Sequence, residues 1–311
     1  MYLCSEGLMR LNDCDRVLLF SWLLLLALGL LMVASASMVV SDQQYGYPFY
    51  YLLHQLVFLL LSLLLVAFVI QVPLKVWYRA SPYALMLGIF LLVIVLIPGL
   101  GRVVNGSRRW LSLGFFTVQV SEAVKLAFIL YLSNYCVRHA EEVRTKAAGF
   151  FKPMLVLLFI AILLLLEPDF GAIAVIVSTF FFVLFIAQVP LRPLALLLAA
   201  ACVLMGVLAV AAPYRLLRLT TFLNPWQHPF GSGYQLTQSL IAFGRGGFFG
   251  VGLGNSVQKL FYLPEAHTDF LFAVIGEEFG LLGECVVLGL FSVLVARTIL
   301  WSKRAKEQGK V

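Results

Sequence analysis

Long apolar runs divide most of this chain into segments of membrane-spanning length. Of its 311 residues, 62% are hydrophobic and 12% are charged, whereas a soluble domain carries roughly a quarter charged residues. A spanning helix needs about 20 mostly apolar residues, because about 30 Å of hydrocarbon is crossed at 1.5 Å per residue. The sequence therefore predicts an all-α, polytopic membrane bundle. Eight spans are expected, over residues 17–40, 50–70, 83–98, 118–136, 154–166, 170–188, 194–212 and 270–298.

The fifth and sixth runs are separated only by the three residues Glu167, Pro168 and Asp169. Proline lacks a backbone donor and interrupts a helix. We therefore expect two antiparallel helices joined by a tight turn, rather than one helix with two carboxylates at its centre. The first run exceeds the 7–15 apolar residues of a signal-peptide core, so it is expected to remain as an uncleaved helix.

Lysine and arginine are unevenly distributed between alternate loops. With a cytoplasmic N-terminus, the inner segments hold 13 of these residues and the outer segments hold seven, although the outer segment 213–269 is the longest. Cytoplasmic loops carry such a basic excess. The net charge of +7 therefore indicates topology, and no nucleic-acid partner is expected.

Charged residues inside the predicted spans need a partner or a purpose, because each costs roughly 2.5–3.5 kcal/mol on insertion scales. Glu122 and Lys125 are three residues apart, so they share one helix face. They are either a structural ion pair, or Lys125 helps to line an anionic pocket, with Asp169 as a third member if its turn lies alongside. Glu277 lies in the last span, where a structural polar contact is the default interpretation.

Three arginines in the outer segment GRVVNGSRRWLSLG, which are Arg102, Arg108 and Arg109, run against the charge bias of the loops. Arg108 and Arg109 either solvate this loop or hold lipid phosphates, because the forked guanidinium donors match phosphate oxygens. The five cysteines form no CxxC pair, so neither a disulfide framework nor a zinc site is predicted.

The long outer loop contains an amphipathic stretch followed by a glycine-rich one. In YQLTQSLIAF, Leu236, Leu240 and Phe243 have helical spacing, which predicts a helix lying on the membrane surface. The next stretch, GRGGFFGVGLGN, lacks the βαβ surroundings of a dinucleotide motif. We expect its glycines to let the backbone approach a ligand or re-enter the edge of the bilayer.

The loop ends in YLPEAHTDF, which places Glu265, His267 and Asp269 at alternate positions. Asp269 can act simply as a cap for the helix that follows. Three titratable groups are more than a cap requires, however. A partly desolvated carboxylate at a membrane boundary can have its pKa raised into the range of a general base.

These motifs, together with SEAVK, EPDFG and LFAVIGEEFG, resemble the SEDS family of polytopic cell-wall proteins over essentially the whole chain. Ala266 is similar to the division branch of that family, because the elongation branch typically has arginine there. The resemblance implies a peptidoglycan glycosyltransferase that polymerises lipid II at the division septum of the inner membrane and releases undecaprenyl diphosphate. Its implied partners are a class B penicillin-binding transpeptidase and division activators.

The resemblance also assigns candidate site residues. The family's proposed catalytic aspartate falls on Asp269, its charged pair on Glu122 and Lys125, and its acidic turn residue on Asp169. A divalent cation, Mg²⁺ or Mn²⁺, could share the neutralisation of the leaving diphosphate, but no ligand cluster indicates one. The residues expected to bind substrate are Arg108, Arg109, Lys125, Gln238, Arg245, Lys259, Glu265 and His267.

The chain departs from the family pattern at three places. Val120 stands where the family commonly has proline, and Phe261 stands where the division branch often has glutamate. The chain also ends after eight of the family's ten spans, so a single membrane domain over 1–311, lacking the last two family spans, is expected.

Two other functions remain open: a lipid II flippase, which would depend on Glu122 and Lys125 in mid-membrane, and a non-catalytic division scaffold.

Overall fold

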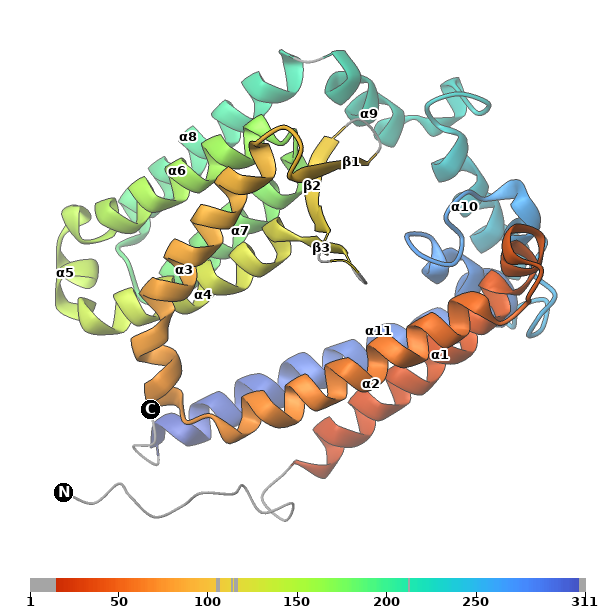
Figure 1. Cartoon of the computed structure of the whole chain (residues 1–311), viewed down its shortest axis with the longest axis horizontal. Helices are drawn as coiled ribbons and strands as arrows, with labels where there is room; N and C mark the ends of the chain where they lie inside the picture. The colour runs from red at the N-terminus through yellow and green to blue at the C-terminus, as the bar shows by residue number, and fades with distance from the viewer. Residues whose placement is uncertain (1–14, 105–106, 113, 115–116, 212, 308–311) are drawn as a thin grey trace. The chain divides into compact units, whose positions relative to one another are not determined.

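The computed structural model describes residues 15–104, 107–112, 114, 117–211 and 213–307. The chain forms two compact units, one made of Met1–Gln71 with Ala209–Val311 and the other of Val72–Leu208. Each unit is described by itself. The elements of Figure 1 are, in chain order, α1 (Arg16–Tyr45), α2 (Tyr50–Gln71), α3 (Leu74–Leu96), β1 (Gly101–Val104), β2 (Ser107–Ser112), β3 (Thr117–Gln119), α4 (Val120–Arg138), α5 (Ala140–Thr145), α6 (Phe151–Leu166), α7 (Phe170–Ile186), α8 (Leu191–Val210), α9 (Pro213–Leu223), α10 (Tyr234–Gly246) and α11 (Leu271–Glu307).

The helices confirm the predicted class of fold. Among the described residues, α1, α2, α3, α4, α8 and α11 are long and apolar enough to cross a membrane, whereas α6 and α7 are shorter apolar helices. All eight predicted apolar runs are therefore helical, but six meet the length of a span, so the count of eight stays a prediction. In α2, no residue of the described structure is buried, as expected of a helix whose apolar side chains face lipid.

A small β-sheet, which the sequence did not predict, occupies the outer segment between the third and fourth apolar runs. The strands β1, β2 and β3 form an antiparallel sheet in that order. Arg102 is paired with Trp110, and Trp110 with Gln119. Sequential strands joined by short connections pair in this way because the inter-strand bonds satisfy the polar backbone. The sheet brings Arg108 and Arg109 next to the end of α3 and the start of α4.

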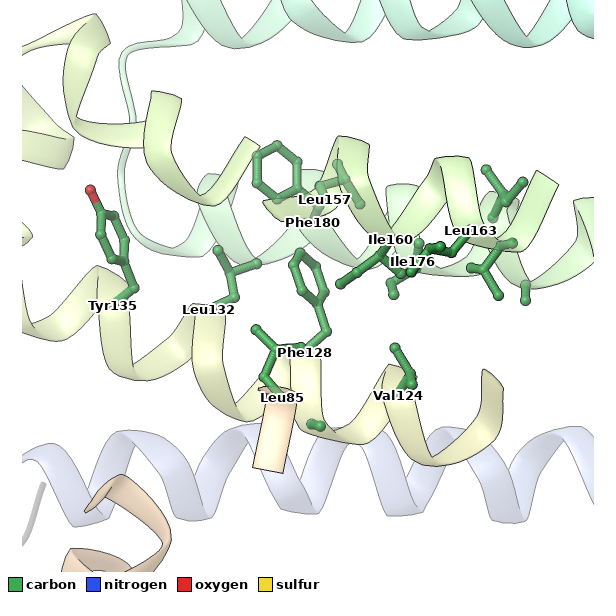
Figure 2. Packing of buried hydrophobic residues seen from close by; sticks show 14 of the residues in the cluster. Leu85, Val124, Phe128, Leu132, Tyr135, Leu157, Ile160, Leu163, Ile176 and Phe180 are labelled. Atoms are coloured by element: carbon green, nitrogen blue, oxygen red, sulfur yellow. The ribbon is translucent and has the colours of Figure 1, made fainter. Parts of the chain in front are cut away.

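The core of the second unit lies between α4, α6 and α7 (Figure 2). Phe128 of α4 and Phe180 of α7 are fully buried and their ring centroids are 6.4 Å apart. A Cβ at Gly88 of α3 would lie 3.0 Å from a methyl of Val124 of α4. Small residues of this kind let membrane helices approach closely, so α3 packs along α4.

In the first unit, α1 lies against both α2 and α11, as Figure 1 shows. The carboxylate of Asp15 caps α1 and also accepts from Arg297 Nε at 2.6 Å and from Trp301 Nε1 at 2.7 Å. These bonds join the start of α1 to the last turns of α11. The predicted amphipathic helix is present as α10, which packs on the first turns of α11.

Candidate active site

The predicted site residues fall into two groups, one in each unit. The first group belongs to the segment from α10 to the start of α11 and contains Asp269. The second group surrounds the turn between α6 and α7 and contains Asp169. The structure describes each group within its own unit.

Asp269 lies in a turn that precedes α11, and its side chain is exposed. Leu263 and Ala266 of the same turn are buried among residues of α1, α10 and α11. Among the described residues, no hydrogen bond or ion pair involves the Asp269 carboxylate. The simple role of helix cap is therefore not supported, because a capping carboxylate accepts from backbone N–H groups of the first turn. Buried apolar neighbours fix this turn, and the carboxylate stays free.

Glu265 and His267 flank Asp269 but have local partners. Glu265 has a positive φ of 57°, and its carbonyl accepts from Thr268 N at 3.1 Å and Phe270 N at 3.2 Å. Its carboxylate accepts from Thr268 Oγ1 at 2.8 Å. The His267 ring lies against Tyr51 of α2, with centroids 4.6 Å apart. Both residues therefore shape the turn that carries Asp269.

Glu277, fully buried on α11, holds the backbone that leads to this turn. Its carboxylate accepts from Ser256 Oγ at 2.5 Å and from the backbone N–H groups of Val257 and Gln258 at 3.1 and 3.2 Å. Arg245 Nη1 lies 3.3 Å from the same carboxylate. Hydrogen bonds to a charged acceptor are about twice as strong as neutral ones, so Glu277 fixes the loop in place.

The neighbouring Glu278 forms a second buried cluster. Lys259 Nζ lies 2.6 Å from its carboxylate and also donates to Ser35 Oγ of α1 at 2.9 Å. Ser35 in turn donates to Glu278 at 3.0 Å. Side chains of Lys259 and Glu278 are 6% and 0% exposed. A buried charge pair of this kind needs such added partners, because desolvation offsets much of its Coulomb energy.

Three glycines let the loop reach α11. A Cβ on Gly246 would lie 1.9 Å from the carbonyl oxygen of Gly276, and one on Gly250 would lie 2.1 Å from that of Glu278. Gly250 and Gly252 also have positive φ. The expected close approach of the glycine-rich backbone is thus to this chain's own helix.

The helix α11 is interrupted at Gly280, which has φ 65° and ψ −163°. The N–H groups of Val251 and Gly252 donate to the carbonyls of Glu277 and Glu278, both at 3.0 Å. After the break, Leu281 N donates to the carbonyl of Gly247 at 3.0 Å. Interrupted helices are tolerated at membrane depth when neighbouring groups satisfy the freed backbone in this way.

These contacts define different roles for the cations predicted near Asp269. Lys259 is buried and paired, so its contacts hold the loop. Arg245 is paired with Glu277, but its side chain is 44% exposed, which leaves guanidinium donors for a ligand. Gln238 is half-buried on α10. None of these geometries tests substrate binding, so the assignments stay predictions.

In the second unit, the expected pair on α4 is present. Lys125 Nζ lies 2.7 Å from Glu122 Oε1, and the side chain of Glu122 is 60% exposed. Both residues lie in the first two turns of α4, near the end of the helix and not at its middle.

Asp169 contacts Arg109 and Ser121, and it is not a third member of the Glu122–Lys125 pair. Its carboxylate caps α7 by accepting from Ala172 N at 3.2 Å and accepts from Ser121 Oγ at 3.1 Å. Arg109 Nη1 lies 3.7 Å from it. Arg109 also donates to the carbonyls of Glu167 and Pro168. A cation at these two carbonyls, just beyond the last turn of α6, also suits the helix dipole.

Glu167, in the turn outside both helices, was not singled out as a site residue. Its side chain is fully buried, and neither carboxylate oxygen has a hydrogen-bond partner among the described residues. Burial, together with the charge of Asp169, raises the pKa of Glu167 to about 8, against the opposing effect of Arg109. Arg108 donates from Nη1 to the carbonyl of Leu96 at 3.1 Å, while its Nε is buried and has no hydrogen-bond partner among the described residues.

Within the described residues, no three His, Cys, Asp or Glu side chains gather as a metal site. Mg²⁺ is commonly held by one or two carboxylates together with substrate phosphates, and the exposed Asp269 could supply one such oxygen. The expectation of a divalent cation stays untested.

Ser35, Ser256 and the contacts of Glu278 were not predicted from the sequence. Lys259 stands among apolar residues in the sequence, so its ammonium group needs a buried acceptor. The adjacent glutamates Glu277 and Glu278 of α11 are the candidates for that acceptor. Nothing in the sequence alone indicates that Ser35, more than 200 residues away, completes the cluster.

Comparison with known proteins shows relatives that match most of this chain. The family model described as "Cell cycle protein", for FtsW, RodA and SpoVE, matches residues 15–310. A protein of Coxiella burnetii named "Probable peptidoglycan glycosyltransferase FtsW" is 57% identical over 96% of this chain and 80% of its own length. A protein of the same name from Legionella pneumophila is 54% identical over 88% of this chain and 69% of its own length.

Solved structures show the same fold. A chain from a structure titled "Structural coordination of polymerization and crosslinking by a peptidoglycan synthase complex" is 27% identical, with a TM-score of 0.72 over 91% of this chain and 76% of that one. The rod shape determining protein RodA of Thermus thermophilus is 26% identical, with a TM-score of 0.62 over 91% of this chain and 73% of its own.

The close contact at Gly246 predicts a sharp difference between two glycines of α10. Gly246→Ala should lower the stability of the first unit by about 1–3 kcal/mol, the cost of overpacking, because the added methyl meets the carbonyl of Gly276. Gly244→Ala is the matched control, since no atom of the described residues lies within 4 Å of its Cβ position. Thermal unfolding of the purified protein in detergent would reveal the difference, and equal melting temperatures would contradict the packing of this loop on α11.

The raised pKa of Glu167 predicts a pH dependence of stability. Between about pH 4.5 and 8 the folded protein keeps a proton on Glu167 that the unfolded chain releases, so the free energy of unfolding falls as pH rises through this window. Glu167→Gln should flatten this fall, whereas the exposed Glu141→Gln should not. Melting temperatures measured from pH 5 to 8.5 test this, and parallel curves for wild type and Glu167→Gln would contradict it.

Proposed function

Because this chain belongs to the FtsW/RodA/SpoVE family of cell-cycle proteins, we propose that it is a peptidoglycan glycosyltransferase that polymerises lipid II into glycan strands during cell division. The family resemblance expected from the motifs is thereby confirmed. The names of the relatives support the enzyme class and the division role. The lipid II substrate and the residues that act on it belong to the proposal.

One observation carries the choice of catalytic residue. Asp269 presents a carboxylate that has no partner among the described residues, on a turn whose neighbours are buried and hydrogen-bonded. A general base must reach the proton that it abstracts in a fixed geometry. The free carboxylate on a rigid support meets that need. The carboxylates of Glu277 and Glu278 on α11, in contrast, already accept hydrogen bonds from the loop.

In the proposed reaction, Asp269 takes the proton from the C4 hydroxyl of an acceptor lipid II sugar. The oxygen attacks the anomeric carbon of the donor glycan and forms the new glycosidic bond. The bond from that carbon to the diphosphate oxygen breaks, and undecaprenyl diphosphate leaves with the electron pair. Attack from the opposite face inverts the α-linked donor into a β-1,4 bond.

The leaving diphosphate gathers negative charge, so preorganised cations are expected to stabilise it. Arg245 keeps exposed donors beside its contact with Glu277, which supports a role in binding diphosphate. Lys259 acts instead by positioning the loop. In the second unit, the candidates for binding the diphosphate are Lys125, Arg108 and Arg109. A divalent cation, Mg²⁺ or Mn²⁺, is a further candidate for neutralising its charge.

The partners and location extend the proposal. The solved complex similar to this chain couples polymerisation with crosslinking, which supports association with a class B penicillin-binding transpeptidase. The sequence motifs support division activators as further partners and the septal inner membrane as the location. The distribution of basic residues supports a cytoplasmic N-terminus.

The flippase alternative gains little support from the structure. It requires charges in mid-membrane, whereas Glu122 and Lys125 pair near the end of α4. A non-catalytic scaffold would tolerate loss of Asp269, so one variant separates it from the enzyme.

Asp269→Asn should lower the rate of lipid II polymerisation by about 100- to 10,000-fold, the usual contribution of a general base. Stability should not change, because the carboxylate has no partner in the part of the chain that the structure describes. The assay uses purified protein and labelled lipid II in detergent, where polymer forms without transport. Asp42→Asn, at another exposed aspartate of the same unit, is the control. A folded Asp269→Asn protein that polymerises at the wild-type rate would disprove the assignment.

A further inference from the structure

A cavity of about 630 Å³ lies in the second unit between the start of α3 and the end of α4. This volume is in the range of small-molecule sites, about 300–1,000 Å³. The cavity is separate from the turn at Asp169, because it lies at the opposite end of α4. Its lining includes three cations, Lys75, Arg79 and Arg138, and no acidic side chain among the described residues.

The three cations are exposed and have no hydrogen bond or ion pair among the described residues. Lys75 and Arg79 are four residues apart on α3, so they share one face of that helix, and Arg138 reaches the cavity from the last turn of α4. Three unpaired cations around one cavity repel each other. An anion bound among them would remove that repulsion.

Asn134 completes the site with a fixed acceptor. Pro82 lacks an N–H group, so the carbonyl of Tyr78 four residues earlier has no helical donor. Asn134 Nδ2 donates to that carbonyl at 2.7 Å and to Ser81 Oγ at 2.8 Å. A carbonyl can only accept, so the orientation of the Asn134 amide is fixed.

The side-chain oxygen of Asn134 is therefore left without a hydrogen-bond donor in the described part of the chain. Asn134 is 6% exposed, and its Oδ1 is buried without a partner among the described residues. Leaving such an atom unpaired is costly. A ligand for this cavity should therefore combine an anionic group with a hydroxyl donor.

The surface beyond the cavity is apolar. Along the same stripe of α3, at helical spacing after Arg79, the side chains of Tyr83, Met86 and Phe90 are 72%, 64% and 60% exposed. A polar anionic end in the cavity and an apolar remainder along this stripe describe an amphiphile. Basic pockets at the membrane boundary between spanning helices are known to bind anionic lipid headgroups.

We propose that this cavity binds the headgroup of an anionic glycerophospholipid, with the phosphate among Lys75, Arg79 and Arg138 and a glycerol hydroxyl donating to Asn134 Oδ1. An ethanolamine headgroup would also offer a donor, but its ammonium would add positive charge beside three cations. The distribution of basic residues places this end of α3 and α4 on the cytoplasmic side, so a lipid of the inner leaflet is the expected ligand. The site is independent of Asp269 and of the proposed reaction.

Native mass spectrometry of the full chain, titrated with phosphatidylglycerol in detergent, tests the phosphate contact. Arg79→Gln with Arg138→Gln should weaken retention roughly 30-fold, because each cation near an anionic surface contributes about a factor of five to six. Lys152→Gln with Arg192→Gln, two exposed basic residues outside the cavity, should leave retention unchanged. Equal retention by both double variants would overturn the site.

Two further arms use the unaltered protein. Phosphatidylmethanol carries the same charge without a free hydroxyl, so it should bind about 3- to 10-fold more weakly than phosphatidylglycerol, the value of one hydrogen bond. Excess inorganic phosphate should fail to displace the lipid, because it lacks the apolar part. Equal binding of the two lipids would overturn the role of Asn134, and displacement by phosphate would overturn the lipid as ligand.

Discussion

Two adjacent buried carboxylates, Glu277 and Glu278, organise the part of the molecule that carries the candidate catalytic residue. They lie in the last turn before the break of α11 at Gly280 and bind different parts of one loop. Glu277 holds backbone N–H groups around Val257, and Glu278 holds Lys259. Removing one partner of a buried pair leaves a charge without compensation, which costs more than the pair contributes. The conformation of the loop therefore depends on both carboxylates.

The second unit uses the same principle at its helix break. Arg109 and Asp169 satisfy the ends of α6 and α7 between them, just as Glu277 and Glu278 satisfy the loop beside α11. In a membrane, irregular backbone persists only where polar groups of the protein replace water. Charged residues that look costly in the sequence are, in both places, what makes the irregular segments stable. Asp269 differs because its side chain is exposed and its carboxylate has no partner among the described residues.

The sequence predicted the helices well, because apolar runs of spanning length allow few other structures. It also predicted the break at Pro168 and the Glu122–Lys125 pair, which depend on local chemistry and spacing. The sheet β1–β3 was not predicted, although Asn-Gly between two β-prone stretches is a hairpin signal. The partners of Lys259 and Asp169 could not be foreseen, since Ser35 and Ser121 come from distant segments. The family motifs identified Asp269 in the sequence. The contacts that support its turn became visible only in the structure.

Hydrogen exchange in the loop tests the central claim most directly, which is that Glu277 holds the backbone leading to Asp269. In Glu277→Leu the amides of Val257 and Gln258 lose a charged acceptor, so they should exchange about 10- to 100-fold faster, and residues 263–270 should follow. Peptides of α6 and α7 should keep wild-type rates, and Glu284→Leu, seven residues further along α11, should leave the loop protected. Unchanged exchange at residues 256–270 in Glu277→Leu would contradict the account.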